Sequence, residues 1–210
     1  MPEPTAGDHA RPSAAVIYHF FAHYRAAVTE CLARSASVRY AFYGDDHDYE
    51  GSIQPAELRP PVDFRLRRCI PLYRHIMWQR GLLGGALGRE HDVLIFLANP
   101  YWPATWVTAA LGRLRGKRIL FWVHGLPADR RGRRARILRF FYRLAHGYLL
   151  YGHMAKQHGM ACGISPERQH VVFNSLDVAA QRRAARDLPP DTVERVRTRL
   201  HRAHGADDRR

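Results

Sequence analysis

Polar residues that could contact a ligand follow several short apolar runs in this sequence, and the clearest case is His124–Gly125. The five residues before this pair, Ile119 to Val123, are all apolar and mostly β-branched or aromatic. Such a run is typical of a strand buried on both faces, as in a parallel sheet covered by helices. Ligands bind at the carboxyl ends of such strands. We therefore expect His124 to face a ligand, with Gly125 allowing a tight turn behind it.

Similar residues follow the other apolar runs. They are His19, His23, Tyr24 and Arg25 after the first run, Gly44 and Asp45 after the second, Asn99, Tyr151 and Gly152 after later runs, and Asn174 and Asp177 after the last. In a parallel sheet all of these positions open onto one edge. A mixture of imidazole, amide, phenol and charged groups with few apolar residues suits a polyhydroxylated or phosphorylated ligand.

Most of these residues also have a purely structural explanation. His124 could be a buried histidine that caps the next turn. His23 and Arg25 could be a surface pair at the start of a helix, and Asn99 a turn residue before a proline. For the others we expect mainly structural roles: a loop acid at Asp45, packing at Tyr151, and shaping of the chain where it leaves the sheet at Asn174 and Asp177.

Apolar runs alternate with segments of helical spacing, which predicts right-handed parallel βαβ units. The expected strands cover residues 14–21, 37–44, 64–72, 91–100, 119–123, 147–152 and 170–173, and the expected helices cover 24–35, 74–87, 105–114, 132–145 and 154–163. The fold class is therefore α/β, with a doubly wound, mostly parallel, Rossmann-like sheet over residues 14–177. We expect residues 1–13 to be disordered and residues 178–210 to form a basic helical tail or linker, broken at Pro189-Pro190.

The composition limits the possible partners and compartments. The chain of 210 residues carries a net charge of +14, nearly all of it from arginine. This charge could attract phosphates of nucleic acid, anionic lipid or nucleotide-sugars, or it could reflect compositional drift of the genome. The three cysteines are far apart and include no Cys-x-x-Cys pair, which argues against a disulfide scaffold or a metal site and fits the cytoplasm. No signal peptide and no run of about 20 apolar residues is evident, so a membrane would be met only at its surface.

Residues 129–143 carry seven arginines. On a helix, Arg136, Arg139 and Arg143 share one face, and Ile137, Phe141 and Leu144 lie on another. One interpretation is a surface helix whose apolar side covers the sheet. The other is an interfacial helix attracted to anionic lipid on the inner face of the cell membrane. The arginines that would meet the lipid are Arg133, Arg134, Arg136, Arg139 and Arg143.

The order and spacing of several segments resemble the amino-terminal domain of family 4 glycosyltransferases of the GT-B fold. The matching segments are HFFAHYR at 19–25, FYG at 42–44, HDVLIFLANP at 91–100, GKRILFWVHG at 116–125, FYRLAHGYLLYG at 141–152 and GISPERQHVVFNSLD at 163–177. The last segment is the most specific, because a Gly-Ile turn, a short strand and Asn-x-x-Asp precede the crossover to the second domain in this family. The histidine-glycine pair at 124–125 is the next most specific.

The resemblance implies transfer of a hexosyl group from a nucleotide-sugar to an acceptor, with retention of configuration and without a metal or other cofactor. It implies that this domain holds the acceptor, that His124 contacts the transferred sugar, and that His19, His23, Tyr24, Arg25, Asn99 and Gly125 contact substrate. Two features depart from the family. The first loop lacks paired glycines, and no donor-binding domain follows residue 177. We therefore expect a fragment, a truncated product or one subunit of a two-chain transferase, with little activity alone.

Three functions compete at this point. The leading hypothesis is the acceptor-side domain of a transferase that acts on a cell-envelope glycan or a lipid-linked acceptor. The alternative is a non-catalytic, orphan half-domain that binds membrane or acceptor and partners a separate donor-binding chain. A nucleic-acid-binding protein is the least favoured, because the sequence has no zinc pattern and no RNA-binding signature.

Overall fold

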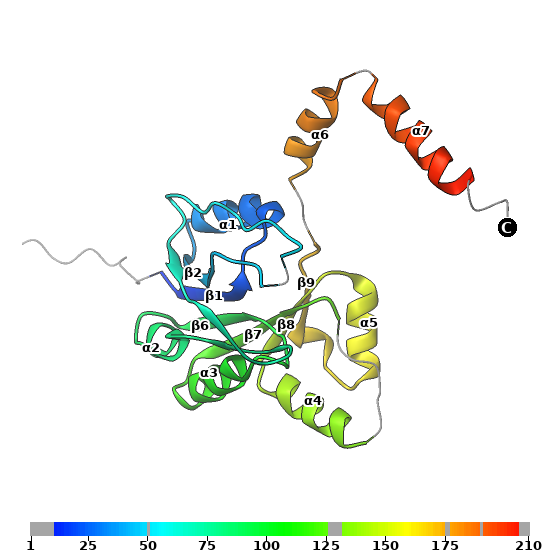
Figure 1. The fold of residues 1–210 in the computed structure, drawn as a ribbon. Helices are drawn as coiled ribbons and strands as arrows, with labels where there is room; N and C mark the ends of the chain where they lie inside the picture. Colours follow the sequence, from blue (N-terminus) through cyan, green and yellow to red (C-terminus); the bar gives the residue numbers. More distant parts are fainter. Residues whose placement is uncertain (1–10, 50, 126–131, 175–176, 190, 206–210) are drawn as a thin grey trace, which may run out of the picture. The chain divides into compact units, whose positions relative to one another are not determined.

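The computed structural model describes residues 11–49, 51–125, 132–174, 177–189 and 191–205 (Figure 1). The chain divides into two compact units, Met1–Leu176 and Asp177–Arg210. The first unit contains the sheet and the candidate site. The second contains two basic helices, α6 (Val178–Arg186) and α7 (Thr192–Gly205), separated near the expected proline break.

The first unit is built on a seven-stranded sheet in which every neighbouring pair is parallel. The strand order is β3-β2-β1-β6-β7-β8-β9. These strands are β1 (Ser13–Phe20), β2 (Arg39–Asp45), β3 (Phe64–Leu66), β6 (Val93–Leu97), β7 (Arg118–Val123), β8 (Gly147–Leu150) and β9 (Gln169–Val171). This architecture confirms the predicted α/β fold with a parallel sheet.

The chain winds in two directions from the middle of this sheet. From β1 it proceeds outward to β2 and β3, and from β6 it proceeds the other way to β9. The topological switch therefore lies between β1 and β6, which pair from Ala14↔Val93 to Ile17↔Phe96. At such a switch the loops on either side diverge, which leaves a crevice at the carboxyl ends of the strands.

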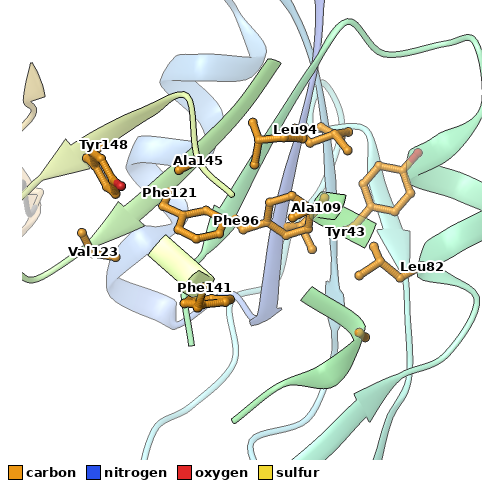
Figure 2. Close-up of a cluster of buried hydrophobic side chains, with 14 of the residues drawn as sticks. Tyr43, Leu82, Leu94, Phe96, Ala109, Phe121, Val123, Phe141, Ala145 and Tyr148 are labelled. Carbon is orange, nitrogen blue, oxygen red and sulfur yellow. The ribbon is translucent and has the colours of Figure 1, made fainter. Parts of the chain in front are cut away.

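One face of the sheet carries the larger part of the apolar core (Figure 2). Helices α2 (Leu82–Leu87), α3 (Pro103–Leu114), α4 (Arg133–Arg143) and α5 (His153–Ala161) all contribute to this core. Phe121 of β7 packs against Phe141 of α4 with ring centroids 4.8 Å apart, and against Phe96 of β6 at 6.2 Å. These aromatic contacts hold α4 against the middle of the sheet.

The opposite face is covered by α1 (Ala26–Ala33), which follows a short 3-10 turn at His23–Arg25. Val28 and Leu32 of α1 pack there against the second apolar cluster, which includes Trp122. Alternate residues of β7 therefore enter different cores: Phe121 lies on one face and Trp122 on the other. Burial of both faces explains the uninterrupted apolar run that the sequence shows.

The helix expected over residues 74–87 was wrong. Residues Cys69–Tyr73 (β4) and Ile76–Gln79 (β5) form an antiparallel hairpin, and only Leu82–Leu87 is helical. Arg74 occupies the left-handed region with φ 46°, which closes the tight turn. The expected strand over 64–72 is correspondingly short, because β3 ends at Leu66 and the residues after it enter the hairpin.

Two polar anchors fix the hairpin to the carboxyl edge of the sheet. Gln79 Nε2 donates to the carbonyl oxygen of Tyr18 at the end of β1 (2.8 Å), and the Cys69 amide donates to Asp45 Oδ2 at the end of β2 (2.6 Å). Burial opposes ionisation of Asp45, but the hydrogen bonds from Cys69 and neighbouring groups prevail and lower its pKa. Asp45 thus has the structural role that the sequence indicates.

The structure also bears on the predicted elements near the two ends of the chain. The expected disordered segment, residues 1–13, lies mostly outside the described residues, but Ser13 already belongs to β1 and is buried. A 3-10 turn at Pro166–Arg168 leads into β9, which starts at Gln169. The expected tail helix is present as α6 and α7.

Two adjacent phenylalanines of α4 provide a matched test of this packing. Phe141 is fully buried, whereas Phe140 is 61% exposed. We expect Phe141→Ala to lower the free energy of unfolding by about 3–5 kcal/mol, because it leaves a cavity beside Phe121. Phe140→Ala should cost less than about 1 kcal/mol. Urea unfolding of both variants measures the difference, and equal losses would mean that α4 does not pack as described.

Candidate functional site

A cleft of about 1020 Å³ lies at the carboxyl edge of the sheet. Its walls come from the segments that follow β1, β2, β6, β7, β8 and β9, and from the β4–β5 hairpin. The polar residues that line it are Tyr18, His19, Tyr24, Arg25, Asp48, Tyr49, Ser52, Arg74, His75, Asn99, Tyr101, His124, Tyr151 and Asn174. Parallel pairing brings together loops that lie far apart in the sequence.

Arg25 is a buried cation of the cleft. Its side chain is held at the end of the 3-10 turn after β1, and the residue is only 8% exposed. Its Nη2 donates to Asn174 Oδ1 (2.9 Å) and to the Tyr151 hydroxyl. The guanidinium carbon lies 5.0 Å from the centre of the Tyr151 ring and 5.4 Å from that of Trp122, within reach of cation–π attraction.

Neutral partners hold Arg25 in place without cancelling its charge. No carboxylate of the described residues forms an ion pair with it. A buried cation is costly unless it is paired, and here only neutral oxygens and aromatic faces offset that cost. The field immediately around Arg25 is therefore positive, which favours an anionic group of a ligand beside it.

His124 lies at the end of β7, directly beside this cation. Its ring is 4.3 Å from the Tyr151 ring in an edge-to-face arrangement. Partial burial and the charge of Arg25 both lower the pKa of His124. Both effects favour the neutral imidazole, which has one donor and one acceptor for the hydroxyls of a ligand.

His19, near the end of β1, and Asp48, in the loop after β2, both line the cleft. Burial lowers the pKa of His19 to about 4, although the nearby Asp48 carboxylate opposes this shift. Asp48 is itself buried and organises its loop, because its Oδ2 accepts from the amides of Ser52 (3.0 Å) and Ile53 (2.9 Å). His19 thus presents a neutral imidazole to the cleft, and the Asp48 carboxylate fixes the shape of the loop after β2.

Aromatic side chains form another part of the cleft wall. Trp102 is nearly buried and its ring lies 5.4 Å from that of His19. Tyr49 and Tyr101 are both exposed. Asn99 Oδ1 accepts from the Tyr101 amide (3.0 Å), and this hydrogen bond fixes the turn that places Tyr101 and Trp102. Exposed aromatic faces with hydroxyl groups at their edges suit a ligand that is partly apolar and partly hydroxylated.

The structure brings together most, but not all, of the residues that the sequence singled out. His19, Tyr24, Arg25, Asn99, His124 and Asn174 line the cleft. His23 and Gly125 are not among its lining residues. The exposed His23 ring instead lies near the carbonyl oxygen of Gln54, with Nδ1 3.2 Å away. Asp177 caps α6 by accepting from the Ala180 amide (2.7 Å).

The contact of Tyr151 with Arg25 and the part played by the hairpin residues were not predicted from the sequence. We expected Tyr151 to pack, and its ring does lie edge-on to that of Trp122, but its hydroxyl also accepts a hydrogen bond from Arg25. Arg74 and His75 enter the cleft from the hairpin turn. The sequence did not indicate this hairpin, because the apolar–polar alternation over residues 76–79 is short. The glycines that follow it are equally compatible with a loop and with a weak helix.

A second hollow, of about 760 Å³, lies at the amino edge of the sheet and has a different character. Lys117 lines this hollow and has a structural role, because its Nζ donates to the carbonyl oxygens of Gly88 (2.7 Å) and His91. His91 in turn bonds Ser13 and Tyr43. These polar groups are hydrogen-bonded to one another, so we place the candidate site at the carboxyl edge.

Among the described residues, no three His, Cys, Asp or Glu side chains gather as metal ligands.

Comparison with known proteins supports the fold. No protein-family model and no curated protein matches the sequence. Among solved structures, the apo form of the lipopolysaccharide outer core galactosyltransferase WaaB is similar (TM-score 0.50, 13% identity), with 79% of this chain covered and 46% of that one. A UDP-GlcNAc 2-epimerase from Methanocaldococcus jannaschii is similar too (TM-score 0.51, 11% identity), with 76% and 45% covered. A further UDP-N-acetylglucosamine 2-epimerase gives a TM-score of 0.51 at 8% identity, with 76% and 47% covered.

These neighbours have GT-B folds, and the Rossmann-like sheet of this chain matches part of each of them. The chain spans less than half the length of each neighbour. At these identities the likeness concerns the fold alone.

The lowered pKa of His19 predicts a loss of stability in acid. The unfolded chain takes up a proton at this residue near pH 6.5, whereas the folded chain resists protonation until about pH 4. Stability should therefore fall as the pH drops through this range, by up to about 3 kcal/mol from this residue. Urea unfolding at neutral pH and at about pH 4.5 should show a smaller fall for His19→Gln than for the wild type. His158→Gln, on the exposed side of α5, is the control. An unchanged fall in His19→Gln would contradict the assignment.

Proposed function

We propose that this chain is the acceptor-side domain of a glycosyltransferase that moves a hexosyl group from a nucleotide-sugar to a cell-envelope glycan or a lipid-linked acceptor. The observation that carries the proposal is the Arg25 cation, held by neutral partners beside the His124 imidazole, in a roomy cleft at the switch of a parallel sheet. A negative group and several hydroxyls on one ligand would satisfy both residues. A nucleotide-sugar or a phosphorylated glycan has this combination.

The roles of the residues follow from their chemistry. Arg25, held by Asn174 and Tyr151, would bind an anionic group and stabilise negative charge that develops on a leaving phosphate. His124 would hydrogen-bond a hydroxyl of the transferred sugar. Tyr101 and Trp102 would place aromatic faces against the C–H faces of a sugar ring. The chain's own groups supply these contacts, and the nucleotide-sugar enters as donor substrate, with no cofactor in the proposal.

The partner of this domain would be a donor-binding domain. The solved neighbours are more than twice as long as the portion that this chain matches. We propose that the second wall of the active site comes from that domain, on a separate chain or in a longer form of this protein. The same observation favours the alternative function, an orphan half-domain that holds acceptor and presents it to a separate donor-binding chain.

A reconstituted enzyme tests the role of His124. The chain is co-expressed with the neighbouring reading frame, and nucleotide release is assayed with a panel of sugar nucleotides. We expect His124→Ala to lower turnover by about a hundredfold, because a contact to the reacting sugar is lost. His158→Ala, an exposed histidine of α5 outside the cleft, should keep wild-type turnover.

Thermal unfolding of both variants separates a loss of contact from a loss of fold. Wild-type turnover in a folded His124→Ala enzyme would remove His124 from the site. Acceptor binding by this chain without any nucleotide release in the combined preparation would favour the orphan alternative.

A further inference from the structure

Helices α3 and α4 expose large apolar side chains on their sides away from the sheet. Leu114 at the end of α3 is 83% exposed, and Phe140 and Ile137 of α4 are 61% and 57% exposed. Val107 and Leu111 extend this apolar surface along α3, because both are also exposed. Single exposed apolar residues are ordinary, but five of them on two neighbouring helices form a patch that needs a partner.

The two helices present one continuous surface. Both pack on the same side of the sheet, where they lie next to each other (Figure 1). The rings of Phe140 and Trp106 stack with centroids 6.2 Å apart, and Arg113 Nη1 donates to the carbonyl oxygen of Leu144 (3.0 Å) at the end of α4. We call this surface, formed by Val107, Leu111, Leu114, Ile137 and Phe140 with the arginines beside them, the α3–α4 face.

The arrangement corrects one expectation from the sequence. In one of the two interpretations of this helix, Ile137, Phe141 and Leu144 share a face that covers the sheet. Phe141 is fully buried and Leu144 is half-buried, but Ile137 points to solvent together with Phe140. Arg133, Arg136, Arg139 and Arg143 are exposed, and the side chain of Arg134 is not among those that the structure describes. The exposed side of α4 therefore combines aromatic, aliphatic and basic residues.

The charge of the α3–α4 face has one sign. Neither helix contains an aspartate or glutamate, and the sequence has no acidic residue between Asp129 and Glu167. Arg113, Arg136 and Arg143 form no ion pair with any acid of the described residues. By contrast, Arg34 and Arg59 elsewhere are paired with glutamates.

We infer that the α3–α4 face docks on the surface of an anionic lipid bilayer. Phe140, Ile137 and Leu114 would enter the boundary between headgroups and acyl chains, and the surrounding arginines would contact the lipid phosphates. Aliphatic side chains at the centre of the patch favour lipid over nucleic acid, whose phosphate backbone offers them no apolar partner. No helix of the described residues is long and apolar enough to cross a membrane, so the contact is peripheral. This inference does not depend on what the cleft binds.

Vesicle co-sedimentation of the full chain tests the docking. We expect binding to vesicles of phosphatidylcholine with about one phosphatidylglycerol in three lipids, and little binding to phosphatidylcholine alone. Arg136→Gln with Arg143→Gln should lower the partition constant about 30-fold, since each arginine near the surface contributes about fivefold. The matched control, Arg34→Gln with Arg59→Gln, removes the same charge from residues outside the face and should bind like the wild type.

A second pair of variants tests the apolar part. Ile137→Ser with Phe140→Ser should lower partitioning about tenfold at unchanged net charge. Val193→Ser with Leu200→Ser, which removes exposed apolar residues of α7, should leave it unchanged. Both α4 residues are exposed, so thermal unfolding should confirm that these variants fold.

Several results would overturn the inference. These are equal binding to neutral vesicles, no loss in the α4 variants, or an equal loss in the control variants. Tight binding of duplex DNA that depends on Arg136 and Arg143, without binding to anionic vesicles, would identify nucleic acid as the occupant instead.

Discussion

All neighbouring strands of the seven-stranded sheet run parallel, and this constraint determines where the polar loops gather. Each strand must be followed by a crossover, so the loops after β1, β2, β6, β7, β8 and β9 all leave the same edge. Apolar side chains cover both faces of the sheet. Most polar groups therefore lie at the edges of the sheet and on the outer surfaces of the helices. The cleft and the α3–α4 face are consequences of this division.

Arg25 shows how the constraint builds the candidate site. Its guanidinium joins the loop after β1 to Tyr151 after β8 and Asn174 after β9, residues that are 126 and 149 positions away in sequence. The partners are neutral, so the contacts order the three loops without cancelling the charge. An ion pair would stabilise the empty cleft and compete with an anionic ligand. The observed arrangement instead keeps the cation preorganised and available.

The sequence was most informative where local pattern and burial agree. The run from Ile119 to Val123 predicts β7 because both faces of that strand are covered, and the position of His124 at its end follows directly. The β4–β5 hairpin was missed because its pairing is local, short and interrupted by Arg74 in a left-handed conformation. The contact between Arg25 and Asn174 was also beyond sequence reasoning, since no local pattern reports which two loops will meet. The exposure of Ile137 depends on how α4 is rotated against the sheet, and helical spacing alone does not fix this rotation.

We propose that the cleft at the carboxyl edge receives an anionic sugar ligand beside Arg25. A titration of the isotope-labelled chain with sugar phosphates and sugar nucleotides, followed by NMR at backbone amides and at the arginine side-chain Nε–H groups, tests this directly. We expect saturable shifts at Arg25 and His124 and in the loops after β1, β7, β8 and β9. Absence of saturable shifts with every ligand tested, or shifts confined to the amino edge around Lys117, would contradict it.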